Sequence, residues 1–132
     1  MYKDNYSMNL EERILSFSKL GQYLLNKNDN ELAQKINAAE NQNAWFTKKN
    51  IKQAIDAWII QLRKKNLDAW ISSYNINCQV KPKTVLILMA GNIPLVGFHD
   101  LLSVLILGYR AIIKPSSSDN ILIPFLCKKL ME

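Results

Sequence analysis

Apolar residues recur at helical spacing through the first half of the chain. Between residues 10 and 25 they form one stripe, with Asn9 placed to cap the start and Glu11 and Glu12 in the first turn. Thr47 is placed in the same way before a longer stripe. The predicted helices cover residues 10–25, 31–40, 48–65 and 67–74.

The second half has a different pattern, in which short apolar runs alternate with turn residues. An apolar run ends at Gly91-Asn92-Ile93-Pro94, a second run ends at Gly108, and a third ends at Lys114-Pro115-Ser116. This order predicts one βαβ unit, and hence a parallel strand pair with a right-handed crossover. The predicted elements are a strand over 84–90, a helix over 95–107, a strand over 111–113 and a helix over 121–131.

The predicted fold class is α/β, with a helical N-terminal region over residues 1–80 and the start of a dinucleotide-binding domain over residues 81–132. Lys81-Pro82-Lys83 marks the junction, because proline does not extend a helix. Two parallel strands bury too little surface to form a domain alone, and the helix over 95–107 is apolar on nearly all sides. We therefore expect the chain to be the N-terminal part of a longer protein, with this α/β domain incomplete.

Composition and charge narrow the class of protein further. The chain has 132 residues and a formal net charge of +6, and its densest basic cluster, Arg63-Lys64-Lys65, falls at the end of a predicted helix, where cations complement the helix dipole. No continuous basic face with interleaved aromatic residues can be traced, so we expect no nucleic-acid partner. No apolar run reaches the length of a membrane span, and residues near the N-terminus do not have the pattern of a secretory segment, so we expect a cytoplasmic protein.

Two spaced motifs resemble the aldehyde dehydrogenase superfamily, and more closely the acyl-CoA reductases of the bacterial bioluminescence type. The first motif is Met89-Ala90-Gly91-Asn92-Ile93-Pro94-Leu95-Val96-Gly97-Phe98-His99-Asp100, and the second is Lys114-Pro115-Ser116-Ser117 after Gly108-Tyr109. Asn43-Ala44-Trp45-Phe46-Thr47 is similar to the closer family too. The resemblance implies an aldehyde-dehydrogenase-like parallel-sheet cofactor domain and a place in fatty acid metabolism.

In this superfamily the acyl group is held as a thioester on a cysteine, and an oxyanion hole stabilises the tetrahedral intermediate. Asn92 matches the asparagine whose amide contributes to that hole. A neutral amide donor suits this role, because it stabilises developing negative charge without being consumed. The alternative is that Asn92 caps a helix opening at Pro94.

The resemblance also implies the cofactor contacts. Lys114 matches the lysine that contacts the adenosine ribose, although a solvated lysine at a strand end is the alternative. Relatives that use NAD have a glutamate three residues later, where this chain has Ser117. Loss of that carboxylate removes repulsion of a 2′-phosphate, so we expect NADPH, with NADH as the second candidate. The predicted cofactor-binding residues are Met89, Ala90, Gly91, Lys114, Ser116 and Ser117.

Gly91 departs from the bulky residue of the superfamily, and two readings of it stay open. The small residue either exposes backbone to the nicotinamide half of the cofactor or widens the tunnel for an acyl chain.

His99 and Asp100 form either a polar pair near the site or structural contacts in a crowded interface. Neither Cys78 nor Cys127 has the position of the family's nucleophile, and one histidine does not build a metal site.

The sequence therefore favours the N-terminal part of an NADPH-dependent reductase that converts an acyl-CoA, or a related acyl thioester, to an aldehyde. Its nucleophile would lie outside these residues, so the chain alone is expected to be inactive. The longer protein is expected to form a homo-oligomer. Two alternatives remain: an aldehyde or semialdehyde dehydrogenase that uses NAD(P), and a non-catalytic interaction module.

Overall fold

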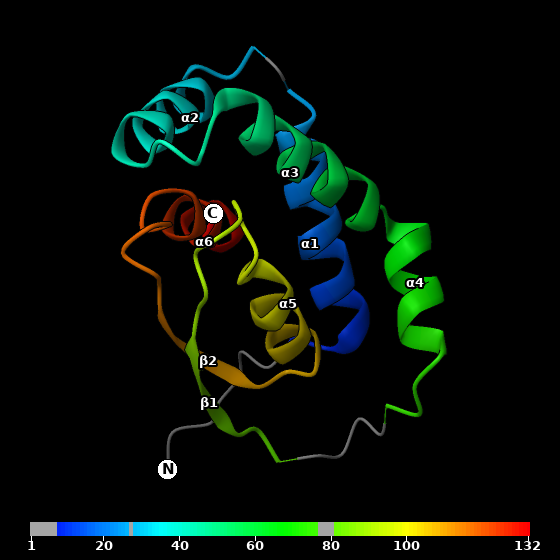
Figure 1. The fold of residues 1–132 in the computed structure, drawn as a ribbon. Helices are drawn as coiled ribbons and strands as arrows, with labels where there is room; N and C mark the ends of the chain where they lie inside the picture. Colours follow the sequence, from blue (N-terminus) through cyan, green and yellow to red (C-terminus); the bar gives the residue numbers. More distant parts are fainter. Residues whose placement is uncertain (1–7, 27, 77–80) are drawn as a thin grey trace.

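The computed structural model describes residues 8–26, 28–76 and 81–132, and it shows a helical body beside a two-stranded parallel sheet (Figure 1). The element order is the one the sequence predicts, with helices first and a strand–helix–strand unit after them. The elements are α1 Leu10–Leu24, α2 Asn30–Gln42, α3 Lys48–Gln61, α4 Lys64–Ser72, β1 Thr84–Leu88, α5 Phe98–Ile106, β2 Arg110–Lys114 and α6 Leu122–Met131.

Polar side chains start the first three helices. Asn9 accepts a hydrogen bond from the Glu12 N–H at 2.9 Å, and the Glu12 carboxylate accepts one from the Asn9 N–H, which makes a complete capping box. Thr47 accepts from the Asn50 N–H at 3.2 Å and starts α3. Both caps are those predicted from the sequence.

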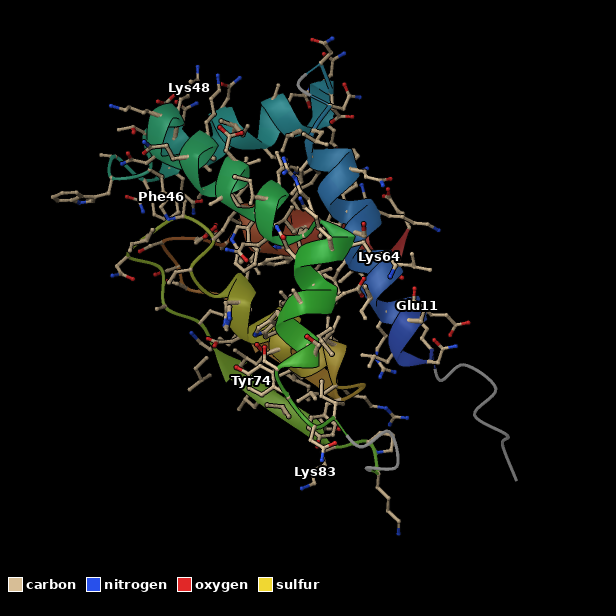
Figure 2. All side chains as sticks on the ribbon, turned by 90° about the vertical axis from the view of Figure 1, so that its right-hand side faces the viewer. Glu11, Phe46, Lys48, Lys64, Tyr74 and Lys83 are labelled. Carbon is tan, nitrogen blue, oxygen red and sulfur yellow. The ribbon has the colours of Figure 1, made fainter. Side chains whose placement is uncertain are left out.

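The single helix predicted over residues 48–65 is wrong, because α3 and α4 are separate helices. The basic cluster therefore lies at the start of α4, where cations do not complement the helix dipole. Lys64 Nζ lies 3.1 Å from Glu11 Oε1 and 2.9 Å from Asp68 Oδ2. Figure 2 shows Lys64 and Glu11 on the neighbouring helices α4 and α1. Ion pairs thus explain the position of this lysine better than the dipole does.

The predicted βαβ unit is confirmed, since β1 and β2 pair in parallel with α5 between them. One face of the sheet packs inward and buries Ile87 and Met89. The other face exposes Leu86, Leu88 and Ile112, at 62%, 71% and 57% of their surfaces. None of the described elements covers this outer face, so the described helices pack on one face of the sheet only.

The helix α5 lies in the middle of the molecule, between the sheet and α1 and α3 (Figure 1). Phe98 is fully buried, and the rings of Phe17 and Trp58 meet it edge-on at centroid distances of 6.3 Å and 4.8 Å. Although this helix is apolar on nearly all sides, its first turn is not buried all round, because His99 and Asp100 are exposed.

Gly108 ends α5 in the left-handed conformation, with φ +79°, which a residue with a Cβ rarely adopts. Arg13 of α1 reaches this end, where its Nε donates to the Ile106 carbonyl at 2.9 Å.

The helix α6 is joined to α2 by charged side chains. Lys129 Nζ lies 2.8 Å from Glu31 Oε2 and 5.1 Å from the centroid of the Tyr23 ring. The hydrogen bond from Lys129 is the main reason that the pKa of Glu31 is lowered. These contacts fix the two helices relative to each other.

Candidate functional site

The residues predicted to form a site lie together at the carboxyl edge of the sheet. Leu88 pairs with Lys114 at the end of the register, and the Met89 N–H then donates to the Lys114 carbonyl at 3.1 Å. The loops that leave β1 and β2 on this edge lead to the N-termini of α5 and α6 (Figure 1). Open α/β sheets bind ligands at this place, outside the carboxyl ends of their strands.

Gly91 lies against Ser116 of the neighbouring loop. A Cβ on Gly91 would lie 2.2 Å from Ser116 Oγ and 2.4 Å from Ser116 Cβ, which is closer than two such atoms can approach. Ser116 is held in place because its Oγ accepts a hydrogen bond from the Ser118 N–H at 3.2 Å. The close contact of the two loops is therefore a third reason for glycine at this position, beside the two that the sequence suggests.

Asn92 is exposed on this edge, in the loop between β1 and α5. The helix predicted from Leu95 is wrong at its start, because Pro94 to Gly97 form a turn and α5 begins at Phe98 with Gly97 as its N-cap. Asn92 therefore lies outside the capping position. Its amide is accessible to a ligand, as an oxyanion donor has to be.

The loop that carries Asn92 is anchored by Asp119, a residue that the sequence analysis missed. Asp119 is 3% exposed, and its Oδ2 accepts a hydrogen bond from the Leu95 N–H at 2.8 Å. Leu95 is also buried and has a φ of +62°, a conformation that is strained for a residue with a Cβ. The carboxylate thus stabilises an unusual turn three residues after Asn92.

Burial raises the pKa of Asp119, and the hydrogen bond from the Leu95 N–H opposes this rise. Asp119 lies in the loop after β2, so its bond to Leu95 joins this loop to the loop after β1. The signal for it was present in the sequence, since a polar residue shortly before an apolar run is typical of a helix start. The partner of the carboxylate, 24 residues earlier, carries no such signal.

The donors on the β2 side are accessible as well. Lys114 and Ser117 are exposed and Ser116 is half-buried. An ammonium and two hydroxyls offer hydrogen bonds to sugar hydroxyls and to phosphate oxygens, and all of these are features of nucleotides. With two helix N-termini on the same edge, the donor set suits an anionic nucleotide better than a cation.

The connection between α2 and α3 also reaches this edge. The side chain of Asn43 donates from Nδ2 to the Ser118 carbonyl at 3.2 Å and accepts from the Trp45 N–H at 3.0 Å. Phe46, which belongs to this connection and is labelled in Figure 2, is buried, whereas Trp45 is 84% exposed. The Asn43–Thr47 motif therefore lies beside the loop after β2, which the sequence did not indicate.

His99 and Asp100 do not satisfy buried backbone groups, because both are exposed. The His99 ring lies between two tryptophans, at centroid distances of 6.4 Å from Trp58 and 5.9 Å from Trp70. Asp100 lies in the first turn of α5.

Cys127 lies half-buried in α6, and burial raises the pKa of its thiol. A thiol with a raised pKa is a poor nucleophile at neutral pH. Cys78 lies outside the described residues. Within residues 8–26, 28–76 and 81–132, no group of three or more His, Cys, Asp or Glu side chains could hold a metal ion.

Comparison with known proteins gives one match. The model of the family described as "Acyl-CoA reductase (LuxC)" matches residues 7–132, which is nearly the whole chain. No curated protein and no solved structure matches. In the part of the chain that the structure describes, every helix is too short or too polar to cross a membrane.

Proposed function

The chain belongs to the acyl-CoA reductase (LuxC) family, and we propose that it forms the N-terminal part of an enzyme that reduces an acyl-CoA, or a related acyl thioester, to an aldehyde with NADPH. The observation that carries this proposal is the cluster at the carboxyl edge of the sheet. There Lys114, the exposed last residue of β2, pairs with Leu88, the last residue of β1, and the exposed Asn92 lies four residues after Leu88 in the loop that leaves β1.

Asn92 is proposed to donate a hydrogen bond from its side-chain amide to the oxygen of the acyl group as negative charge develops on that oxygen. Asp119 would keep this amide in position through the Leu95 turn. Removal of one such donor typically lowers turnover about a hundredfold to a thousandfold.

Lys114, Ser116 and Ser117 are proposed to bind the adenosine ribose and its 2′-phosphate, and the backbone of residues 89–91 to face the rest of the cofactor. NADPH would supply the hydride. The ammonium and the hydroxyls present here match a phosphorylated ribose in charge and in hydrogen-bond donors.

The acyl-cysteine would form on a thiol outside residues 1–132, since neither Cys78 nor Cys127 has the position of the family's nucleophile and burial raises the pKa of Cys127. The exposed apolar face of the sheet supports a longer protein, in which further elements of an aldehyde-dehydrogenase-like cofactor domain cover Leu86, Leu88 and Ile112. In this proposal residues 1–80 are the helical N-terminal region and residues 81–132 begin the cofactor domain.

The test is product analysis with the enzyme encoded by the complete reading frame. We expect acyl-CoA and NADPH to give aldehyde and free CoA, whereas residues 1–132 alone give neither. Tighter binding of NADH than of NADPH would refute the cofactor assignment. Formation of acid from aldehyde, with no reaction of acyl-CoA, would refute the reductase assignment.

A further inference from the structure

Two apolar hollows lie in a row between the α3–α4 pair and α5. The first, called the near hollow, has a volume of 460 Å³ and is bounded by Trp58, Leu67, Ile93, Val96 and Leu102, among others. The second, called the far hollow, has a volume of 570 Å³ and extends past Tyr74, Ser103 and Leu107. Figure 2 looks onto this side of the molecule, with Tyr74 at the end of α4.

Trp70 and His99 line both hollows, and their rings are 5.9 Å apart. The two side chains therefore form the partition between the hollows. Trp58 supports the partition from the near side, because its ring packs edge-on against the buried Phe98 and lies 6.4 Å from His99.

The near hollow begins at the candidate site. Ile93, which directly follows Asn92, lines it and is 56% exposed, and Val96 of the same loop is 37% exposed. The order along the groove is thus Asn92, near hollow, partition, far hollow.

The chemistry of the lining selects the occupant. None of the described residues that line the two hollows is Lys, Arg, Asp or Glu. Each volume is within the usual range of about 300–1,000 Å³ for small-molecule sites, which are mostly apolar. A nucleotide or a charged peptide would find no counter-charge here, whereas an alkyl chain needs none.

We propose that the near hollow binds the alkyl chain of the acyl substrate and that Trp70, together with His99, sets the longest chain that fits. This inference rests on the proposed function, because it takes the acyl group to start at Asn92. Alkyl chains that end at the partition fill the near hollow. Longer alkyl chains gain no further affinity unless the partition is removed and the far hollow becomes accessible.

The test is calorimetric titration of the full chain with a series of saturated acyl-CoAs, each below its micelle concentration. Each buried methylene should lower the Kd about fourfold, so Kd falls with chain length and then levels at the length that reaches Trp70. Trp70→Ala should join the hollows and move the levelling point to longer chains, and Trp70→Leu should move it less.

Two further variants separate this effect from loss of folding. Ser103→Trp fills the far hollow, so it should leave the wild-type profile unchanged but restore the original levelling point in the Trp70→Ala chain. Trp45→Ala removes an exposed tryptophan that does not line the groove and should change nothing. Circular dichroism checks that each variant is folded.

An unchanged levelling point in folded Trp70→Ala would overturn the partition, even if acyl-CoA still binds and the proposed function stands. Equal Kd values for free CoA and palmitoyl-CoA would overturn the groove as the acyl site. The chain could instead form a dimer that dissociates in Trp70→Ala but not on addition of palmitoyl-CoA. That result would assign the groove to a second copy of the chain and would also overturn the proposal. Failure of the proposed function is read separately, from the absence of aldehyde formation by the complete enzyme.

Discussion

Replacement of Asp119 by alanine is the most direct perturbation of the turn that carries Asn92. The change removes the acceptor of the Leu95 N–H, which is buried and hydrogen-bonded at 2.8 Å. A buried donor left without a partner costs about 1–3 kcal/mol. Part of this loss is offset, because alanine also removes a carboxylate whose burial is unfavourable. We therefore expect the free energy of unfolding to fall by about 1 kcal/mol, which is measurable against the roughly 5–15 kcal/mol that stabilises a typical domain.

The assay is urea unfolding at neutral pH, with Asp119→Asn and Asp56→Ala as companions. The asparagine keeps an oxygen that can accept from Leu95, so it should cost less than alanine. Asp56 is exposed on α3, and its replacement should change stability by about 0.5 kcal/mol at most. If Asp119→Ala is as stable as the wild type, the hydrogen bond to Leu95 does not stabilise the turn and the reasoning fails.

The pH dependence gives a second check of the same residue. The pKa of Asp119 is higher in the folded chain than in the unfolded chain, because of burial. Between the two pKa values the folded state binds more protons, so the contribution of Asp119 to stability increases as the pH falls through its folded pKa. The stability of the wild type relative to Asp119→Asn should therefore increase on acidification. A constant difference would show that the carboxyl group titrates alike in both states.

Three further predictions concern other parts of the structure. Gly91→Ala should cost about 1–3 kcal/mol in urea unfolding, because its Cβ would overlap Ser116, and Ser116→Gly should recover most of that loss; no recovery would contradict the contact. Ser117→Glu should shift the ratio of NADPH to NADH affinity toward NADH by about tenfold or more, because the added carboxylate repels the 2′-phosphate of NADPH by about 1.4 kcal/mol. An unchanged ratio of the two affinities in calorimetry would show that Ser117 does not contact the ribose. Lys129 lowers the pKa of Glu31 in the folded state, so the stability that this pair contributes is lost as the pH falls through that pKa. Glu31→Gln should therefore flatten the acid side of the curve of stability against pH. An unaltered curve would show that the pair contributes nothing to stability.

The sequence predicts local structure well wherever one segment contains the whole signal. The caps Asn9 and Thr47 and the break at Gly108 were all predictable, because a cap or a glycine stop acts within a few residues. The boundary between α3 and α4 was not, since apolar spacing continues across it and Lys64 is placed by ion pairs with Glu11 of α1 and with Asp68 of its own helix.

The candidate site was predictable in its composition but not in its supports. Strand order alone brings Asn92 and Lys114 to one edge of a parallel sheet. The contacts that fix this edge join residues far apart in the sequence: Asp119 with Leu95, Asn43 with Ser118, and Gly91 with Ser116. Hydrophobic periodicity carries no information about such pairs, and the row of hollows beside Trp70 follows from packing between three helices.

The proposed role of Asn92 in the reduction is tested most directly by steady-state kinetics of Asn92→Ala in the enzyme encoded by the complete reading frame. Asn120→Ala, at an exposed asparagine on the loop before α6, is the matched control. The account predicts that Asn92→Ala lowers kcat about a hundredfold to a thousandfold with little change in the Kd for NADPH, whereas Asn120→Ala leaves kcat unchanged. A kcat for Asn92→Ala within a few-fold of the wild type would contradict the assignment of the oxyanion site.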